Sequence, residues 1–261
     1  MTALSARNPK VQRLRRLARQ RSFREAEGAF VVEGFKLVDE ALAEHVALEA
    51  IFATPGVDLT RFGAPGVDVL VVADDVLATA LDTVTPQGTA AIARTSATKL
   101  SDIEPTGGPV LVLVGIGDPG NAGTLVRAAE SGGCSAVVLC GESVDPFSPK
   151  CVRASAGSIF RVPVVSEPSA ATVLEWLGDH GVRRFGTDAE GGADYDTVPL
   201  TAPVAIVLGS ESHGLPPALA PLFDGMLRIP MAGRAESLNV AMTGSVVLFE
   251  AARQRRAEVR R

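Results

Sequence analysis

The chain has 261 residues, of which 46% are apolar and 21% are charged, and its formal net charge is -5. This length indicates one large or two unequal domains, and the composition excludes disordered and collagen-like chains. No apolar run approaches the ~18 residues of a membrane span, and the N-terminus lacks the apolar core of a secretory signal. Three cysteines and three scattered histidines give no disulfide framework and no metal site. We therefore expect a cytoplasmic protein with no membrane or metal partner.

The first 24 residues are strongly basic. They contain eight lysines and arginines and no acid, so the rest of the chain must carry -13. Val11, Leu14 and Leu17 recur every three residues, which predicts an amphipathic helix with a basic outer face. Such a face is either a solvated helix surface or a binding site for a phosphate backbone. The candidate RNA-binding residues are Arg13, Arg15, Arg16 and Arg19.

The chain pattern changes near residue 109. Residues 1–100 contain short strands and helices and are predicted to form a smaller α/β domain, and residues 101–108 are read as a polar linker. Residues 109–261 alternate continuous apolar strands with helices, including helices expected over 148–160 and from about 236 to 256. This alternation predicts a parallel sheet covered on both faces.

Two glycine-containing loops suggest other chemistry. Residues 115–120 fit the G-x-G-x-x-G pattern of a nicotinamide-dependent oxidoreductase, although Pro119 removes an amide donor from the loop. Residues 209–214 are similar to the nucleophile elbow of a hydrolase, but Ser210 stands where that elbow needs a glycine. Both are weak alternatives.

Three polar segments each follow the end of a predicted strand, where open α/β sheets bind ligands. The first runs from Asn121 through Gly123 to Arg127, the second contains Glu211, and the third contains Ser237 and Asn239. Singly, each residue also has a structural interpretation, since Asn121 or Ser237 could cap a helix and Glu211 could be a loop acid. Three such segments in this order favour a functional site.

The set N-x-G-x-x-x-R, LGSExxGL and IPM…SLNVA resembles the three signature motifs of the SpoU/TrmH family of RNA ribose 2′-O-methyltransferases, in the SPOUT superfamily. The resemblance covers about residues 109–256, and residues 8–42 are also similar to the ribosomal-L30-like substrate-binding domain of this family. Within that family, the sequence most resembles the ribosomal RNA branch that includes thiostrepton-resistance methyltransferases.

The resemblance implies a fold, a cofactor and a partner. The expected fold is a C-terminal parallel-sheet SPOUT domain with a deep trefoil knot, preceded by a smaller L30-like α/β domain. The expected protein is a homodimer that uses S-adenosyl-L-methionine to methylate a ribose 2′-OH, in 23S ribosomal RNA. A transfer RNA substrate, or a non-catalytic RNA-binding protein that retains the fold, is the alternative.

The resemblance also assigns site residues. The cofactor would be held by Leu208, Gly209, Ile229, Met231, Ser237 and Leu238. Arg127 would be essential, either as the general base that the family mechanism proposes or as a clamp for phosphate and the developing alkoxide. Asn121 would hold the ribose or orient Arg127, and Glu211, Ser237 and Asn239 would complete the catalytic site.

Overall fold

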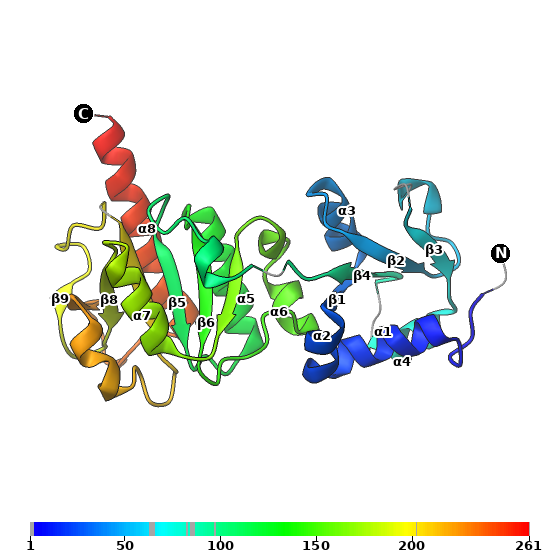
Figure 1. The fold of residues 1–261 in the computed structure, drawn as a ribbon, viewed down its shortest axis with the longest axis horizontal. Coiled ribbons are helices and arrows are strands. Elements are labelled where there is room, and N and C mark those ends of the chain that lie inside the picture. Colours follow the sequence, from blue (N-terminus) through cyan, green and yellow to red (C-terminus); the bar gives the residue numbers. More distant parts are fainter. Residues whose placement is uncertain are drawn as a thin grey trace. The chain divides into compact units, whose positions relative to one another are not determined.

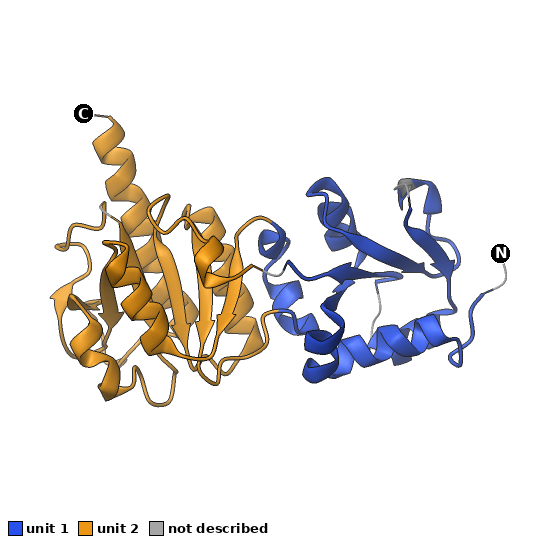
Figure 2. Cartoon of the chain, in the orientation of Figure 1, with its two compact units in different colours: residues 1–97, 147–160 blue, residues 98–146, 161–261 orange. Residues whose placement is uncertain are grey.

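The computed structural model describes residues 3–62, 66–81, 83, 87–96, 98–201 and 203–260, and these form two compact units. The first unit contains residues 1–97 and 147–160, and the second contains residues 98–146 and 161–261 (Figure 2). Residues 147–160 lie inside the range that the sequence pattern assigned to the C-terminal domain. The chain therefore passes from one unit to the other three times.

The first unit is built on a mixed four-stranded sheet with the order β1-β4-β2-β3. β4 pairs antiparallel with both β1 and β2, and β2 pairs parallel with β3. The strands are β1 (Ala29–Glu33), β2 (Leu48–Ala53), β3 (Asp68–Val71) and β4 (Thr89–Arg94). The α-helices are α1 (Pro9–Arg19), α2 (Arg21–Glu27), α3 (Phe35–Ala43), α4 (Asp74–Leu81) and α6 (Pro149–Ala154), and the 3₁₀-helices are η1 (Leu59–Phe62) and η3 (Ser158–Phe160).

Helix α1 is amphipathic, as its sequence predicts. Val11, Leu14 and Leu17 are buried in the core of the first unit. Asn8 caps the helix, since its side chain accepts a hydrogen bond from the Lys10 amide. The single predicted basic helix is in fact two helices, because the chain is extended at Gln20 before α2 begins.

Helix α6 packs against β1 within the first unit. Phe147 stacks on Phe30 with ring centroids 4.9 Å apart. Arg153 forms an ion pair with Glu33, whose side chain is only 4% exposed. The helix expected over 148–160 is shorter than predicted, because Ala156 and Gly157 have positive φ and separate α6 from η3.

The second unit is an all-parallel seven-stranded sheet with the order β7-β6-β5-β10-β8-β11-β9 (Figure 1). The strands are β5 (Val110–Val114), β6 (Ala136–Cys140), β7 (Val164–Glu167), β8 (Arg183–Thr187), β9 (Ala193–Asp194), β10 (Val204–Leu208) and β11 (Gly225–Arg228). The helices are η2 (Leu100–Asp102), α5 (Pro119–Ser131), α7 (Ala170–Asp179), η4 (Pro217–Leu222) and α8 (Val240–Val259). The central strands are buried throughout, which confirms the predicted sheet covered on both faces.

Helices α5 and α8 pack closely on one another. A Cβ atom on Gly244 of α8 would come within 2.4 Å of the Leu125 side chain and 2.7 Å of the Leu208 side chain, so any larger residue would force both leucines to shift. The contact fixes the N-terminus of α8 beside that of α5. Helix α8 begins at Val240, four residues later than predicted, so Glu236 and Ser237 lie in the loop that precedes it.

Candidate active site

The three polar segments meet at the carboxyl ends of the parallel strands. Segment one starts α5 after β5, segment two follows β10, and segment three leads into α8. Because β5 and β10 are neighbours in the sheet and α5 packs on α8, the topology brings residues about 120 positions apart together. The structure therefore brings the three segments together at the sheet edge that the rule for open sheets indicates.

A chain of hydrogen bonds joins one residue from each segment. The Asn239 side-chain amide donates to Asn121 Oδ1 over 3.2 Å, and Asn121 Nδ2 donates to Glu211 Oε1 over 2.6 Å. Asn239 is also the N-cap of α8, with its Oδ1 accepting from the amides of Ala241 and Met242. The side chains of Asn239, Asn121 and Glu211 thus form one hydrogen-bonded network.

Two of the structural interpretations of these residues are wrong. Asn121 does not cap α5, because Asp118 is the cap and accepts from the Asn121 amide over 2.9 Å. Ser237 does not cap α8, because Asn239 does. The amide of Asn121 contacts Glu211 and Asn239, so it is not directed at Arg127 in this structure.

Arg127 lies on α5, two turns beyond Asn121, with its side chain exposed. Within the described part of the chain it has neither a hydrogen bond nor an ion pair. An unpaired, exposed guanidinium remains free to bind an anion. Neither Arg127 nor Asn121 contacts the cavity described next.

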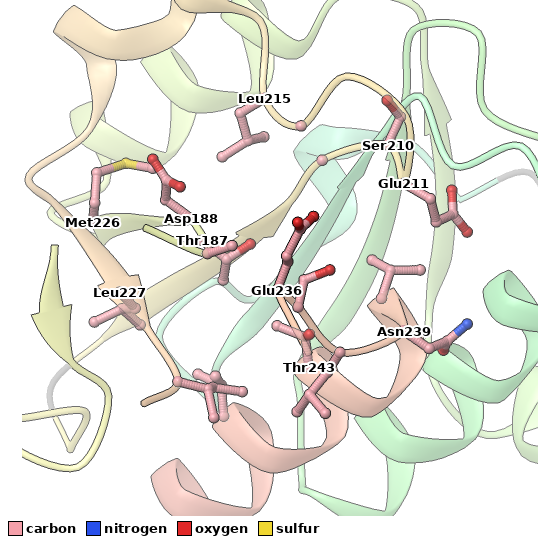
Figure 3. Close-up of a pocket in the computed structure, with 18 of the residues that line it drawn as sticks. Thr187, Asp188, Ser210, Glu211, Leu215, Met226, Leu227, Glu236, Asn239 and Thr243 are labelled. Carbon is pink, nitrogen blue, oxygen red and sulfur yellow. The ribbon is translucent and has the colours of Figure 1, made fainter. Parts of the chain in front are cut away.

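A cavity of about 650 Å³ adjoins this network (Figure 3). Of the residues assigned to the cofactor, five line it, and these are Gly209, Ile229, Met231, Ser237 and Leu238. Leu208 does not, because its side chain is fully buried beside Gly244. Glu211 and Asn239 lie on the same side of the cavity in Figure 3.

The loop after β10 is held in a tight turn. Ser210 and Gly214 exchange two backbone hydrogen bonds, and the Ser210 hydroxyl accepts from the His213 amide. A Cβ atom on Gly209 would lie 2.3 Å from the Gly214 backbone, which excludes any other residue there. This turn presents Glu211 at the cavity edge.

A further wall of the cavity was missed by the sequence analysis. Thr187 ends β8, Asp188 and Ala189 follow it, and Met226 and Leu227 belong to β11. The same strand-end rule would have indicated residues 187–189, since β8 lies beside β10. The apolar residues of β11 carry no comparable signal in the sequence.

An ion pair joins the two strands that form this wall. Asp224, directly before β11, accepts from the backbone amide of Arg184 over 2.7 Å and from its guanidinium over 2.9 and 3.1 Å. The side-chain hydrogen bond from Arg184 lowers the pKa of Asp224. The bond ties the start of β11 to the start of β8, and later residues of both strands line the cavity.

The cavity chemistry suits a cationic ligand with an apolar part. Among the described residues its lining contains the acids Asp188, Glu211 and Glu236 and no lysine or arginine. Its apolar residues include Leu215, Met231 and Leu238. S-adenosylmethionine carries a sulfonium and an ammonium group beside an adenine ring, so the residues present fit it.

Cysteine and metal chemistry find no support in the described residues. Burial raises the pKa of the Cys134 and Cys140 thiols to about 12, so both are held as unreactive thiols. In the ranges that the structure describes, no group of three histidine, cysteine or acidic side chains could hold a metal ion. No helix of that part of the chain is long and apolar enough to cross a membrane.

A parallel sheet, a cavity at its strand ends and three linked polar loops define an α/β ligand-binding protein. The SpoU rRNA Methylase family matches residues 108–249, and the MRM3-like substrate binding domain matches residues 8–91. The chain belongs to the SpoU rRNA methylase family.

Relatives of known structure or assigned activity extend over nearly the whole chain. The 23S rRNA (guanosine(2553)-2′-O)-methyltransferase RlmP of Bacillus subtilis is 33% identical over 94% of this chain and 96% of its own. The crystal structure of the SpoU methyltransferase AviRb from Streptomyces viridochromogenes with AdoMet superposes with a TM-score of 0.88, at 28% identity, over 96% of this chain and 99% of that one. The AdoMet-bound rRNA methyltransferase of Sinorhizobium meliloti gives a TM-score of 0.87 at 36% identity, covering 96% and 97% of the two chains. The expected fold class, a parallel-sheet SPOUT domain preceded by a smaller α/β domain, is confirmed.

Proposed function

We propose that this protein transfers a methyl group from S-adenosylmethionine to a ribose 2′-OH of 23S ribosomal RNA. The observation that carries the proposal is the hydrogen-bonded network of Asn121, Glu211 and Asn239, which joins all three family motifs beside an acid-lined cavity. The names of the similar proteins favour ribosomal over transfer RNA.

The cofactor would occupy the cavity. Gly209, Ile229, Met231, Ser237 and Leu238 would hold it, together with the backbone of Leu208. When bound, S-adenosylmethionine supplies an activated methyl group on a positively charged sulfur. The protein must therefore supply binding, alignment of the ribose oxygen, and removal of its proton.

Arg127 would bind a phosphate of the RNA. Its guanidinium is exposed and unpaired among the described residues, and it lies on the same helix as Asn121. Arginine forms bidentate hydrogen bonds with phosphate, which would fix the ribose next to the cavity. Positioning of this kind contributes a large part of the rate in group-transfer reactions.

Four further features belong to this proposal. We assign RNA recognition to residues 1–100 and catalysis to residues 109–261, with 101–108 as the linker. The family match over residues 108–249 supports the trefoil knot that the resemblance implies. Met242 and Phe249, which are 56% and 48% exposed one heptad apart on α8, support a homodimer contact on that helix. The protein would act in the cytoplasm.

The activity is tested with the full-length protein and total RNA from a strain that lacks the gene. We expect tritium transfer from labelled S-adenosylmethionine to one ribose, and calorimetric binding of S-adenosylmethionine but not of NAD. Arg127→Ala should lower transfer by at least about 100-fold because it removes the phosphate contact. Persistent transfer in that variant would contradict the catalytic assignment, and absence of transfer by the wild type would favour a non-catalytic RNA-binding protein.

A further inference from the structure

We propose that Glu211 is the catalytic residue that accepts the proton of the ribose 2′-hydroxyl, while Arg127 remains protonated throughout. The inference rests on the proposed function and adds the identity of the proton acceptor. It reassigns to Glu211 the general-base role that the family resemblance attaches to Arg127.

Arginine is poorly suited to accept this proton. A guanidinium has a pKa above ~12, so it is protonated at neutral pH and offers no lone pair. Arg127 is also exposed, with no described carboxylate or other partner beside it. The acceptor must therefore be another group, close both to the cavity that would hold the methyl donor and to the helix that carries Arg127.

Four titratable side chains line the cavity in the described residues: Asp188, Glu211, His213 and Glu236. Of these, only Glu211 has a hydrogen bond to α5, through Asn121. In Figure 3, Asp188 lies on the side formed by Met226 and Leu227, away from Asn239. Among these four, Glu211 alone lies both at the cavity and in hydrogen-bond contact with the helix that carries Arg127.

The polarity of the network leaves Glu211 with one free acceptor atom. Two backbone N–H groups of α8 donate to Asn239 Oδ1, so its Nδ2 must face Asn121 Oδ1. Asn121 Nδ2 must then face Glu211, and it occupies Oε1. Oε2 has no hydrogen-bond partner among the described residues. Asn121 and Asn239 are thus positioning residues for a carboxylate acceptor.

The chemical step balances with these groups. The 2′-hydroxyl proton passes to Glu211 Oε2 as the 2′-oxygen forms a bond to the methyl carbon. The bond between that carbon and sulfur breaks, and its electron pair remains on the sulfur, which loses its positive charge. The products are the 2′-O-methyl ribose, S-adenosylhomocysteine and a neutral Glu211, whose proton then passes to water.

The experiment compares full-length variants at Glu211 under single-turnover conditions. Glu211→Gln keeps an oxygen that can accept from Asn121 but cannot take a proton, so we expect the transfer rate to fall 10²–10⁴-fold. Binding of S-adenosylmethionine by calorimetry and of RNA by filter retention should change less than about threefold. In Glu211→Ala, added formate should restore activity in proportion to its concentration, because formate supplies the missing carboxylate.

Matched variants distinguish the loss of a catalytic group from the general effect of removing a charge or disturbing the structure. Glu190→Gln removes the same charge from an exposed loop residue outside the cavity and should leave the rate unchanged. Formate should not restore Arg127→Ala. A rate loss below tenfold in Glu211→Gln would overturn the proposal, and so would a loss that weaker cofactor binding explains wholly. Rescue by formate of an Asp188 or Glu236 variant, in place of Glu211→Ala, would also overturn it. A wild type that transfers no methyl group would instead contradict the proposed function.

Discussion

At the residue scale, the sequence selected several of the residues that the structure brings together, but not their contacts. Motif spacing selected Asn121, Glu211 and Asn239 as three separate candidates, and their hydrogen bonds depend on strand order, which no single motif specifies. The cap of α5 was predictable, because Asp118 precedes a proline at the first helical position, a common arrangement at helix starts. Local signals can thus indicate a cap such as Asp118, while roles within a network require the fold.

The pair of Arg153 and Glu33 gives a residue-scale prediction. Glu33 is almost fully buried, so Arg153→Met should leave its charge uncompensated and lower the free energy of unfolding by about 1–3 kcal/mol. Adding Glu33→Gln to that variant removes the charge and should recover part of the loss. Urea denaturation measures the free energy of unfolding of the single and the double variant. Equal stability of the single and double variants would show that the charge is not responsible.

At the element scale, α1 shows how far amphipathicity can be read from sequence. The spacing of its apolar residues predicted the buried face, but it did not show that the arginines are used differently. Arg13 bonds to Glu27 and Glu49, and the hydrogen bond to Glu49 raises its pKa. Arg16 lies over the Phe23 ring and Arg19 donates to the Thr79 carbonyl. Arg15 has no such partner in the described ranges.

This difference sharpens the proposed RNA contact of α1. Arg15 and Arg7 are both exposed and have no partner among the described residues, so Arg7→Gln with Arg15→Gln should weaken RNA binding. The slope of log affinity against log salt should flatten by about 1.4–1.8, as expected for two lost phosphate contacts. Arg13→Gln is the control, since it should cost about 1 kcal/mol of stability and leave the slope unchanged. An unchanged slope in the double variant would remove α1 from the RNA-binding surface.

At the scale of the whole molecule, the order of segments along the chain does not match the two compact units. Residues 147–160 follow two strands of the second unit yet pack on β1 of the first. Apolar periodicity could not reveal this, because it indicates that a face is buried but not which partner buries it. The parallel sheet was predictable, since its continuous apolar strands alternate with helices.

A whole-molecule prediction follows for fragments of the first unit. Residues 1–97 alone lack Phe147 and Arg153, the partners of Phe30 and Glu33, so this fragment should be less stable than the unit in the intact chain. Joining residues 147–160 to it through a glycine-serine linker should raise the urea midpoint. Equal midpoints for the two fragments would show that α6 contributes nothing to the unit.

The same chain path has a consequence for synthesis on the ribosome. The first unit cannot acquire its last helix until residue 160 has emerged, and by then β5, α5 and β6 have already been made. At translation rates of roughly 5–20 residues per second, β1 waits on the order of 3–12 s for its partner helix after residue 97 is added. Throughout that interval Glu33 and Phe30 lack their partners Arg153 and Phe147. Such a chain would depend on chaperone protection more than a protein whose domains are completed in order.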